Sequence, residues 1–421
     1  MSFFKYSNEC LHVEDVCVSK ISQTVGTPFY VYSTASILDR FQAFKTAFSN
    51  KNALIAYALK ANSNQAILTL LAKQGAGADV VSEGELRRAI KAGIPASCIV
   101  FSGVGKTIRE IDFALSQGIR CFNVESEPEL EQLSARAVAI GKKASVSLRI
   151  NPNVDAKTHS KISTGKSENK FGIPLKDAHA VYARAVQLPG LDVCGVDVHI
   201  GSQICELEPF DIAFAITADF IQNLKNNGIK LRHIDIGGGL GITYKPSNDP
   251  LPSIHDYALL VDKHFGSLDL DIICEPGRHI VGNAGLLVTS VIYLKKGDGR
   301  NFVIVDGAMN DLIRPTLYDA WQNIIPVKMP KQDEEHICAD IVGPVCETGD
   351  YLGLQRLLPV PQNGDLLAVT GSGAYGAVMA STYNTRLLVP EVLVSGDKWS
   401  VIRPRLDYDT LIGLDNIPDW L

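Results

Sequence analysis

A lysine and two turns carry the residue types from which a catalytic site could be built. Lys60 ends the short β-like run in YALKAN (57–62), and its amine can form a Schiff base with an aldehyde. The turn GGGLG (237–241) can expose backbone N–H groups to an anion, because it consists almost entirely of glycine. The turn EPGR (275–278) adds an acidic and a basic side chain. We therefore predict a Schiff-base lysine beside a phosphate site.

Eight apolar runs supply the strands that must position these residues. Each run is rich in β-branched and apolar residues, ends near Gly, Ser or Asn, and is followed by a segment of helical period. The runs are ALIAYALK (53–60), ADVVS (78–82), CIVFSG (98–103), CFNVES (121–126), SVSLRIN (145–151), GVDVHIG (195–201), HIDIGG (233–238) and DIICEPG (271–277). Repeats of this kind predict an α/β fold, a (β/α)8 TIM-type barrel with its functional groups at the C-terminal ends of the strands.

The length of the chain and a change in its pattern of expected strands and helices predict two domains. A chain of 421 residues, 46% of them hydrophobic, is too long for one ordinary domain. After residue 277 strand-like runs follow one another without long helices, from 286–294 to 399–404. We predict a barrel over 31–277 and a mainly β domain over 278–421, joined by residues 1–30. The polar segment 155–172 is predicted to be a mobile lid or a plain surface excursion.

Composition excludes several classes of partner. The net charge is -6 and the basic residues are scattered, so nucleic acid is not an expected partner. No apolar stretch approaches the roughly 18 residues that a membrane helix needs, and the N-terminus has no signal-peptide pattern, so no membrane contact and a cytoplasmic location are expected. None of the nine cysteines lies in a CxxC pair, so we predict free thiols and no metal.

The position of the two turns strengthens the phosphate hypothesis. Taken alone, a glycine cluster is more often a tight turn than a phosphate site, but here the turns follow the seventh and eighth predicted strands, where such barrels often bind phosphate. Lys60 and His199 end the first and sixth strands and would face the same barrel mouth; either one alone would more often be a surface or core residue. With the acid Glu275, they provide the amine, the phosphate donors, the acid and the flat group that pyridoxal phosphate requires.

The chain resembles the diaminopimelate decarboxylase family, within the alanine-racemase-like fold group of pyridoxal phosphate enzymes, nearly from end to end. The strings that carry the resemblance are YALKAN (57–62), DVVSEGEL (79–86), HIGSQI (199–204), GGGLG (237–241), CEPGR (274–278), IRPTLYDAW (313–321), CETGD (346–350) and GAYG (373–376). The resemblance implies a carbon–carbon lyase that decarboxylates meso-2,6-diaminopimelate to L-lysine and CO2, the last step of lysine biosynthesis.

The resemblance also implies roles for individual residues. Lys60 forms the Schiff base with pyridoxal 5'-phosphate, His199 stacks on the ring, and Glu275 pairs with the pyridine nitrogen. The other expected cofactor-binding residues are Asp79, Ser202, Gly238, Gly239, Gly277, Arg278 and Tyr375. Once CO2 has left, a proton must return from Cys346 or Lys60, and the resemblance favours Cys346.

Substrate specificity depends on the end of the substrate that is remote from the carboxylate to be removed. Diaminopimelate presents a second carboxylate there, which Arg314 can bind through a bidentate fork, with Tyr318 one helical turn further on. Glu347 would meet the distal ammonium, and Arg278 and Tyr375 complete the expected substrate set. Without the resemblance, Arg314 would more often be a surface ion-pair partner. In this family Cys346, Glu347 and Tyr375 act across a twofold interface, which implies a homodimer with shared active sites.

Four alternatives remain at this point. A related ornithine- or lysine-type decarboxylase should place an acid where Arg314 lies, and a racemase would not be expected to carry CETGD (346–350). A non-catalytic pyridoxal phosphate carrier would need only the barrel. The string GSGAYG (371–376) follows a strand and has Glu391 about twenty residues further on, as an NAD-dependent oxidoreductase would require. No sufficient crossover helix separates it from the strand at 387.

Overall fold

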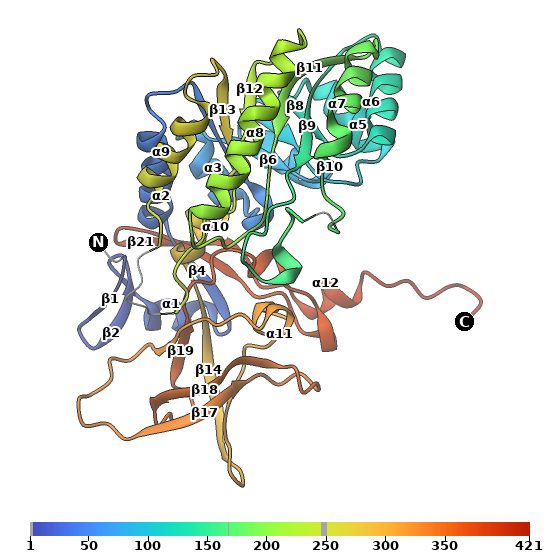
Figure 1. Cartoon of the computed structure of the whole chain (residues 1–421). Coiled ribbons are helices and arrows are strands. Elements are labelled where there is room, and N and C mark those ends of the chain that lie inside the picture. Colours follow the sequence, from blue (N-terminus) through green and yellow to red (C-terminus); the bar gives the residue numbers. More distant parts are fainter. Residues whose placement is uncertain (1–2, 167, 246–250) are drawn as a thin grey trace. The chain divides into compact units, whose positions relative to one another are not determined.

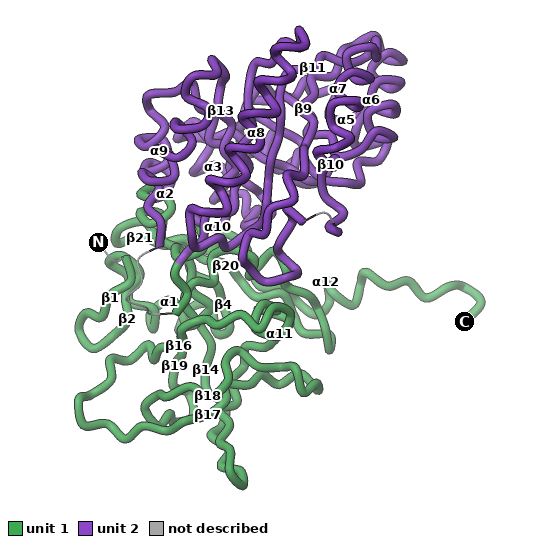
Figure 2. Tube along the Cα trace, in the orientation of Figure 1, with its two compact units in different colours: residues 1–39, 243–248, 280–421 green, residues 40–242, 249–279 purple. Residues whose placement is uncertain are grey.

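The chain folds into two compact units. The computed structural model describes residues 3–166, 168–245 and 251–421 (Figure 1). Unit 1 contains residues 1–39, 243–248 and 280–421, and unit 2 contains residues 40–242 and 249–279 (Figure 2). The domain bounds expected from the sequence, 31–277 and 278–421, stay a prediction.

Unit 2 is built on a closed barrel of parallel strands, as predicted. The strands follow one another in the order β9, β11, β12, β13, β5, β6, β7 and β8, and β8 pairs again with β9. Their bounds are β5 (Ala53–Ala58), β6 (Gly77–Val80), β7 (Ile99–Phe101), β8 (Cys121–Val124), β9 (Ala144–Asn151), β11 (Leu191–Asp197), β12 (His233–Asp235) and β13 (Asp271–Cys274). Every predicted run overlaps one of these strands, so the (β/α)8 prediction is confirmed.

Helices connect the barrel strands, and polar side chains mark where several of them begin. The helices are α2 (Thr34–Ala47), α3 (Gln65–Ala72), α4 (Glu83–Lys91), α5 (Ile108–Gln117), α6 (Glu127–Ala139), α7 (Leu175–Gln187), α8 (Glu208–Asn226), α9 (Ile254–Phe265) and the short α10 (Arg278–Val281). Asn64, Ser82 and Ser126 each accept a hydrogen bond from a backbone N–H in the first turn of α3, α4 and α6. Such caps contribute about 1 kcal/mol each, and they end each loop at a defined residue.

Lys60 lies just beyond its strand rather than within it. The predicted run extended to residue 60, but β5 ends at Ala58 and Lys60 lies in the 3-10 turn η1 (Leu59–Ala61). The N–H of Ala58 donates to the carbonyl of Pro276 at 3.2 Å. Gly277 permits this approach, since a Cβ at that position would lie 2.9 Å from the Cβ of Ala61. The loops after the first and eighth barrel strands are therefore packed directly together.

The segment predicted as a lid contacts the residues that follow β11. It contains the 3-10 turn η3 (Ser160–Ile162), and β10 (Ile173–Pro174) follows it and pairs with β9. Ser163 forms an isolated bridge with Gly201, and the hydroxyl of Thr164 donates to the carbonyl of His199 at 2.9 Å. Ser167 lies outside the described residues. The mobility of the segment stays a prediction.

Unit 1 is mainly β, as predicted for the second domain. One sheet has the order β18, β17, β15, β14, β4, β20 and β21, with β19 pairing with both β14 and β16, and β1, β2 and β3 form a small sheet. The bounds are β1 (Phe4–Ser7), β2 (Cys10–Val13), β3 (Val16–Cys17), β4 (Phe29–Ser33), β14 (Gly285–Lys296), β15 (Asn301–Val305), β16 (Ile324–Pro326), β17 (His336–Val342), β18 (Tyr351–Pro359), β19 (Leu366–Val369), β20 (Glu391–Ser395) and β21 (Lys398–Arg403), with helices α1 (Val18–Val25), α11 (Arg314–Tyr318) and α12 (Tyr408–Ile412).

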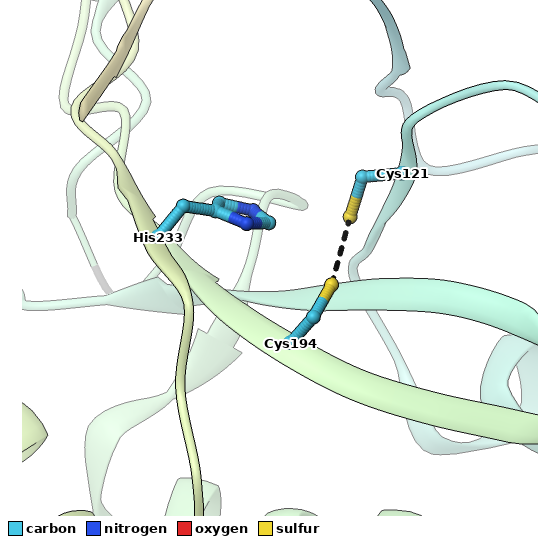
Figure 3. Close-up of side chains that lie close together, drawn as sticks. All are labelled: Cys121, Cys194 and His233. Carbon is cyan, nitrogen blue, oxygen red and sulfur yellow. Dashed lines mark hydrogen bonds between the residues drawn. The ribbon is translucent and has the colours of Figure 1, made fainter. Parts of the chain in front are cut away.

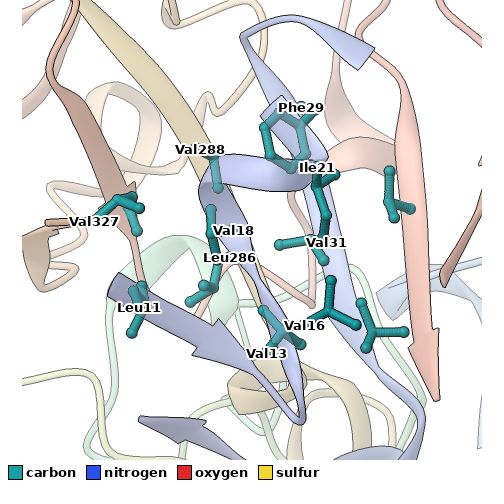
Figure 4. Close-up of a cluster of buried hydrophobic side chains, with 13 residues drawn as sticks. Leu11, Val13, Val16, Val18, Ile21, Phe29, Val31, Leu286, Val288 and Val327 are labelled. Atoms are coloured by element: carbon teal, nitrogen blue, oxygen red, sulfur yellow. The ribbon is translucent and has the colours of Figure 1, made fainter. Parts of the chain in front are cut away.

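A buried apolar cluster ties the N-terminal segment to the later strands of unit 1 (Figure 4). Val13, Val18 and Phe29 come from the N-terminal segment, and Leu286 and Val392 come from β14 and β20. Each is at most 1% exposed, and burial of such a side chain contributes about 1.5–3 kcal/mol. Residues between Leu11 and Val31 are therefore part of the core of the β unit.

Two of the nine cysteines differ from the prediction of free thiols. Cys10 and Cys17 form a disulfide, so that prediction is wrong for these two residues. The β2–β3 hairpin pairs His12 with Cys17 and thereby brings the two sulfur atoms together, a pairing that the spacing alone did not reveal. The free cysteines are Cys98, Cys121, Cys194, Cys205, Cys274, Cys338 and Cys346. Among the described residues, no helix combines the length and the apolar character needed to cross a membrane.

The glycine string that resembles a dinucleotide-binding turn has the wrong structural context. GSGAYG (371–376) does follow a strand, β19, but only the 3-10 turn η5 (Ala377–Met379) comes after it. A dinucleotide site requires the N-terminus of a full helix at this point. The structure therefore gives no support to the oxidoreductase alternative.

Candidate active site

Lys60 faces a buried acid across the first two barrel strands. Its Nζ donates to Oδ2 of Asp79 at 2.7 Å. The side chain of Lys60 is 34% exposed whereas that of Asp79 is fully buried at the end of β6. A lysine at the carboxyl end of one strand is thus held at the barrel mouth by a carboxylate on the next strand.

Three more carboxyl groups lie buried in the same unit. Asp197, Asp235 and Glu275 end or follow β11, β12 and β13, and each is at most 5% exposed. Burial, together with Asp235, Asp79 and Asp197, raises the pKa of Glu275 well above its usual range, and Lys60 opposes this shift. Burial raises the pKa of Asp235 to about 6. A hydrogen bond with Glu275 partly offsets the raised pKa of Asp235.

Polar neighbours that the sequence prediction missed hold this pair in place. The amide of Asn123 donates to Oδ2 of Asp235 at 3.1 Å and to Oε1 of Glu275 at 3.4 Å. The hydroxyl of Ser102 also contacts Oε1 of Glu275 at 3.4 Å. Asn123 lies in β8 and Ser102 directly follows β7, so both lie where barrel strands end. Their positions near strand ends could have identified them as site residues. Asn and Ser are also common in ordinary turns, however, so the sequence alone did not single them out.

His199 presents a neutral ring. Burial, with the cations Arg149 and Lys60 nearby, lowers the pKa of His199 well below its usual range. Its Nδ1 accepts a hydrogen bond from the N–H of Gly238 at 3.1 Å, so the remaining ring proton is on Nε2. Arg149, which the sequence analysis also missed, donates to the carbonyl of His199 at 3.1 Å. The imidazole is thus held in one tautomer as a flat, uncharged surface.

The glycine-rich turn 237–241 is compact because its neighbours leave no room for side chains. A Cβ on Gly238 would lie 2.2 Å from the carbonyl oxygen of Glu275, and one on Gly239 would lie 2.4 Å from that of Gly201. Gly239 also has φ +105°, a conformation that favours glycine. These contacts hold the turn against the loops that follow β11 and β13.

Ser202 and Arg278 meet beside this turn. Nη2 and Nε of Arg278 donate to the hydroxyl oxygen of Ser202 at 3.0 and 3.3 Å. Arg278 is 6% exposed and begins α10, directly after β13 and its EPG turn. A guanidinium, a hydroxyl and glycine backbone at one place are suitable donors for a phosphate group.

These residues fit pyridoxal phosphate in three respects. The phosphate donors, the amine and the flat ring all follow barrel strands of unit 2. Burial raises the pKa of Asp235 and of Glu275, and a positively charged ring nitrogen would favour the ionised form of both acids. The glycines at 238 and 239 let the turn pack against the loops after β11 and β13, which carry Ser202 and Arg278. The residues present therefore match the donor set that the cofactor needs.

Arg314 lies in unit 1 and stacks on an aromatic ring. It is the first residue of α11 and is 6% exposed. Its guanidinium carbon lies 4.5 Å from the ring centroid of Tyr244, a residue that the sequence analysis did not identify. A Cβ on Gly371 would lie 3.0 Å from the same ring. Tyr244 is therefore held between Gly371 and Arg314, an arrangement that no local pattern could reveal. Tyr318 ends the same helix.

Cys346 and Glu347 are exposed on a loop of unit 1 that a buried acid holds. Oδ1 of Asp350 accepts from the N–H of Met309 at 2.6 Å, and Oδ2 accepts from that of Val345 at 2.7 Å. The N–H of Cys346 donates to Oδ1 of Asn384 at 3.1 Å. A hydrogen bond to Glu347 raises the pKa of Tyr383. The thiol and carboxylate are therefore presented to the surroundings from a fixed backbone.

One hydrogen bond links this loop to the helix that carries Arg314. The hydroxyl of Thr316 donates to the carbonyl of Gly349 at 2.5 Å. Tyr375 lies on a separate loop and has φ +54°. That loop packs closely on its own unit, because a Cβ on Gly373 would lie 1.8 Å from the carbonyl oxygen of Val281. Unit 1 thus presents Arg314, Tyr318, Cys346, Glu347 and Tyr375 from three short segments.

Known proteins resemble this chain over almost its whole length. Residues 34–282 match the family model described as pyridoxal-dependent decarboxylase, pyridoxal binding domain. A diaminopimelate decarboxylase from Vibrio cholerae is 50% identical over 418 residues, which cover 99% of both chains. The crystal structure of diaminopimelate decarboxylase from Helicobacter pylori, complexed with L-lysine, has a TM-score of 0.90 and 45% identity, and covers 94% of this chain and 98% of that one.

A structure from M. jannaschii extends the similarity. This diaminopimelate decarboxylase in co-complex with L-lysine has a TM-score of 0.94 and 37% identity, and covers 99% of this chain and 98% of that one. The match therefore includes both the barrel and the β unit. The chain belongs to the diaminopimelate decarboxylase family of pyridoxal-dependent decarboxylases.

Proposed function

We propose that this protein decarboxylates meso-2,6-diaminopimelate to L-lysine and CO2, the last step of lysine biosynthesis, with pyridoxal 5'-phosphate as cofactor. The observation that carries the proposal is the barrel mouth of unit 2, where Lys60 lies 2.7 Å from the buried Asp79. The acid Glu275 and the donors Ser202 and Arg278 follow strands of the same barrel. The similarity to diaminopimelate decarboxylases, which extends over almost the whole chain, supports the choice of substrate.

The cofactor would be held by the residues that follow the barrel strands. Ser202, Gly238, Gly239, Gly277 and Arg278 would bind its phosphate, with backbone N–H groups and the guanidinium as donors. His199 would lie against its ring, because the imidazole is neutral and fixed in one tautomer. Glu275 would face the ring nitrogen. Bound there, pyridoxal phosphate supplies an aldehyde for amines and a ring that accepts electron density from the substrate.

Residues of unit 2 would manage the first proton. Lys60 must lose a proton before its amine attacks an aldehyde, and its contact with Oδ2 of Asp79 would hold the amine at the barrel mouth. Glu275, with Asp235 beside it, would favour a proton on the ring nitrogen, because a carboxylate stabilises a nearby positive charge. The neutral His199 adds no positive charge to compete with that proton.

Residues of unit 1 would recognise the substrate and return the second proton. Arg314 would bind the distal carboxylate and is held in orientation by the ring of Tyr244. Tyr318 and Tyr375 would add hydroxyl groups, and Glu347 would meet the distal ammonium. Cys346 would donate a proton to the substrate α-carbon after CO2 leaves, and its exposed position on a fixed loop suits a group that must reach a bound ligand.

We further propose that two copies form a homodimer in which Cys346, Glu347 and Tyr375 act across the interface. The C-terminal segment supports an association, because Leu414, Ile417 and Trp420 are 72%, 83% and 82% exposed. Analytical ultracentrifugation of the full chain should give a dimer. A monomer at the concentration used in a turnover assay would remove this part of the proposal.

The experiment that tests the function is a CO2-release assay on the protein loaded with pyridoxal phosphate. meso-Diaminopimelate, L-ornithine and L-lysine are offered in parallel, and the product is identified as L-lysine by chromatography. We expect kcat/KM for meso-diaminopimelate to exceed that for the other amines by at least about 10²-fold, because they lack the distal carboxylate that Arg314 needs. Comparable values for ornithine would instead indicate a basic amino-acid decarboxylase.

A further inference from the structure

A group of soft donor atoms lies inside the barrel, one layer beneath the site described above. Cys121, Ser147 and His233 lie in β8, β9 and β12, each two residues before a polar residue of the upper layer. Because side chains alternate along a strand, these three also point into the barrel. Barrel interiors are usually filled by branched aliphatic residues, so a thiol, a hydroxyl and an imidazole in one layer are unusual.

A β-bulge brings a second thiol into this layer. The register between β11 and β9 shifts between Val193 and Gly195, which makes Cys194 the additional residue of the bulge. Bulges redirect a side chain relative to regular alternation. The next residue must be glycine, because a Cβ on Gly195 would lie 2.3 Å from Nε2 of His233. The backbone of β11 thus presents Cys194 and leaves space for the imidazole.

The donor atoms are spaced as metal ligands are. The sulfur atoms of Cys121 and Cys194 lie 3.8 Å apart, and these atoms and a ring nitrogen of His233 all lie within 4.8 Å of one another (Figure 3). An ion at the centre of a triangle with such edges lies about 2.2–2.8 Å from each corner, and zinc bonds are about 2.3 Å to sulfur and about 2.0–2.1 Å to nitrogen. We propose that Cys121, Cys194 and His233 form a buried binding site for a thiophilic metal ion of the Zn2+ type.

The chemistry of the site suits a doubly charged ion. Binding replaces the protons of two thiols, so Zn2+ and two thiolates give a neutral unit and two protons pass to solvent. Two arginines, Arg120 and Arg232, lie close enough to His233 to act on it electrostatically. The side chains of all three proposed ligands are at most 3% exposed, and a neutral unit is the form that such burial tolerates.

Ser147 provides an oxygen beside the three donors. Its hydroxyl lies 2.7 Å from Nε2 of His233 and 3.3 Å from the sulfur of Cys121. It can hydrogen-bond to a metal ligand and so hold that ligand in orientation. In the protein without metal it hydrogen-bonds to these donors.

The nearby arginines do not prevent a cation from binding, because each has an acidic partner. Arg232 makes a two-pronged ion pair with Asp192 at 2.6 and 3.2 Å, and Arg120 lies 3.4 Å from Asp271. Their charges are therefore largely balanced before an ion enters.

The same geometry argues against a disulfide between the two thiols. Cys121 and Cys194 lie on strands that are separated by β9. Strands lie about 4.8 Å apart, so the two Cα atoms are separated by about 9 Å, whereas a disulfide needs about 4.4–6.8 Å. The sulfur atoms can therefore share an ion but cannot bond to each other without displacing a strand.

The test is Co2+ binding to the full chain. Because the donors are buried, the protein is unfolded in denaturant and refolded with one equivalent of Co2+ or Zn2+, then desalted; pyridoxal phosphate is added only afterwards. We expect about one metal ion per chain by mass spectrometry, and tetrahedral Co2+ absorption with thiolate-to-metal charge transfer. Cys121→Ser and His233→Gln should lower the bound metal at least about tenfold. The matched control Cys98→Ser, a thiol of the same unit outside the cluster, should keep it.

Several results would overturn the proposal. Refolded wild-type protein without thiolate charge transfer would identify the cluster as an ordinary packed core, and this result does not depend on any variant folding. Metal retained by both cluster variants would place the ion elsewhere. Metal lost equally from Cys98→Ser would show binding without a defined site. None of these readouts involves turnover, so the result is independent of the proposed function.

Discussion

The functional residues of the barrel and those of the β unit are held in different ways. In unit 2, Lys60, Asp79 and Glu275 lie at or beyond the ends of barrel strands. Lys60 donates to Asp79, and Glu275 accepts from Asn123. In unit 1, Cys346 and Glu347 are exposed on a loop whose backbone is held by Asp350 and Asn384. The barrel residues are thus held by side-chain contacts, whereas the loop is held mainly through its backbone.

This difference predicts a division of labour. Substitutions in the barrel should alter how the cofactor binds as well as turnover. Substitutions in unit 1 should alter substrate affinity or proton return while the cofactor stays bound.

The largest expected effect is that of Lys60→Ala. We expect turnover of meso-diaminopimelate to be abolished, because the amine proposed to hold the cofactor aldehyde is removed. The visible absorption of the protein with pyridoxal phosphate should also be lost, as a spectrum will show. The control Lys91→Ala, at the exposed end of α4, should keep both. A fully active Lys60→Ala protein would refute the role.

The second-largest effect on turnover is expected for Cys346→Ala. Loss of a proton donor is expected to lower kcat by about 10² or more, with no change in cofactor affinity. Steady-state kinetics and a cofactor titration measure the two quantities. Cys338→Ala, which removes another exposed thiol of unit 1, should be neutral. An unchanged kcat would assign proton return to Lys60 or to water.

Arg314→Ala should affect substrate more than cofactor. Removal of the guanidinium should raise the KM for meso-diaminopimelate by about 30- to 160-fold, because a charge-assisted pair contributes about 2–3 kcal/mol. Arg356→Ala is the matched control, since that guanidinium also stacks on an aromatic ring, Trp321, at 4.1 Å. Equal effects on cofactor and substrate affinity would remove Arg314 from substrate recognition and weaken the contrast between the units.

The smallest effect concerns stability rather than catalysis. Burial, with Asp79 nearby, raises the pKa of Glu85 to about 7, and its Oε2 accepts from the N–H of Val81 at 2.8 Å. A raised carboxyl pKa means that the folded state binds more protons than the unfolded state. Glu85 therefore lowers stability as pH rises from about 4.5 to about 7, by about 1–2 kcal/mol for a partly exposed group.

Urea denaturation of wild type and Glu85→Gln between pH 4.5 and 8 measures this contribution. The variant should lose that part of the pH dependence. Glu83→Gln is the control with the opposite sign, because hydrogen bonds from Arg87 lower the pKa of Glu83. Identical pH profiles for wild type and Glu85→Gln would show that Glu85 titrates normally in the folded protein.

Some features were predictable because they are local. The eight barrel runs were visible as short apolar segments with helical segments between them, and caps such as Ser82 marked helix starts. The glycines of the turn 237–241 were visible as residues, although the reason for them, the carbonyls of Glu275 and Gly201, was not. Lys60 was predicted to lie within the first strand, but β5 ends at Ala58. The N–H of Ala58 donates there to the carbonyl of Pro276, a residue from a distant part of the chain that the local sequence does not reveal.

Other features depended on contacts that no local pattern records. Asn123 and Tyr244 became recognisable only when Glu275 and Arg314 were seen beside them. The disulfide between Cys10 and Cys17 required the register of a hairpin. The inward thiol of Cys194 required a bulge, which adds one residue to a strand without a sequence marker.

The amino-acid sequence by itself determined the class of fold, the family and the chemical types available to the site, because periodicity and short motifs act over neighbouring residues. Only the tertiary structure decided which acids lie together, which ring supports Arg314, and which thiols face each other inside the barrel. Those properties depend on distances of a few ångströms between residues far apart in the chain, and on the burial that such packing creates.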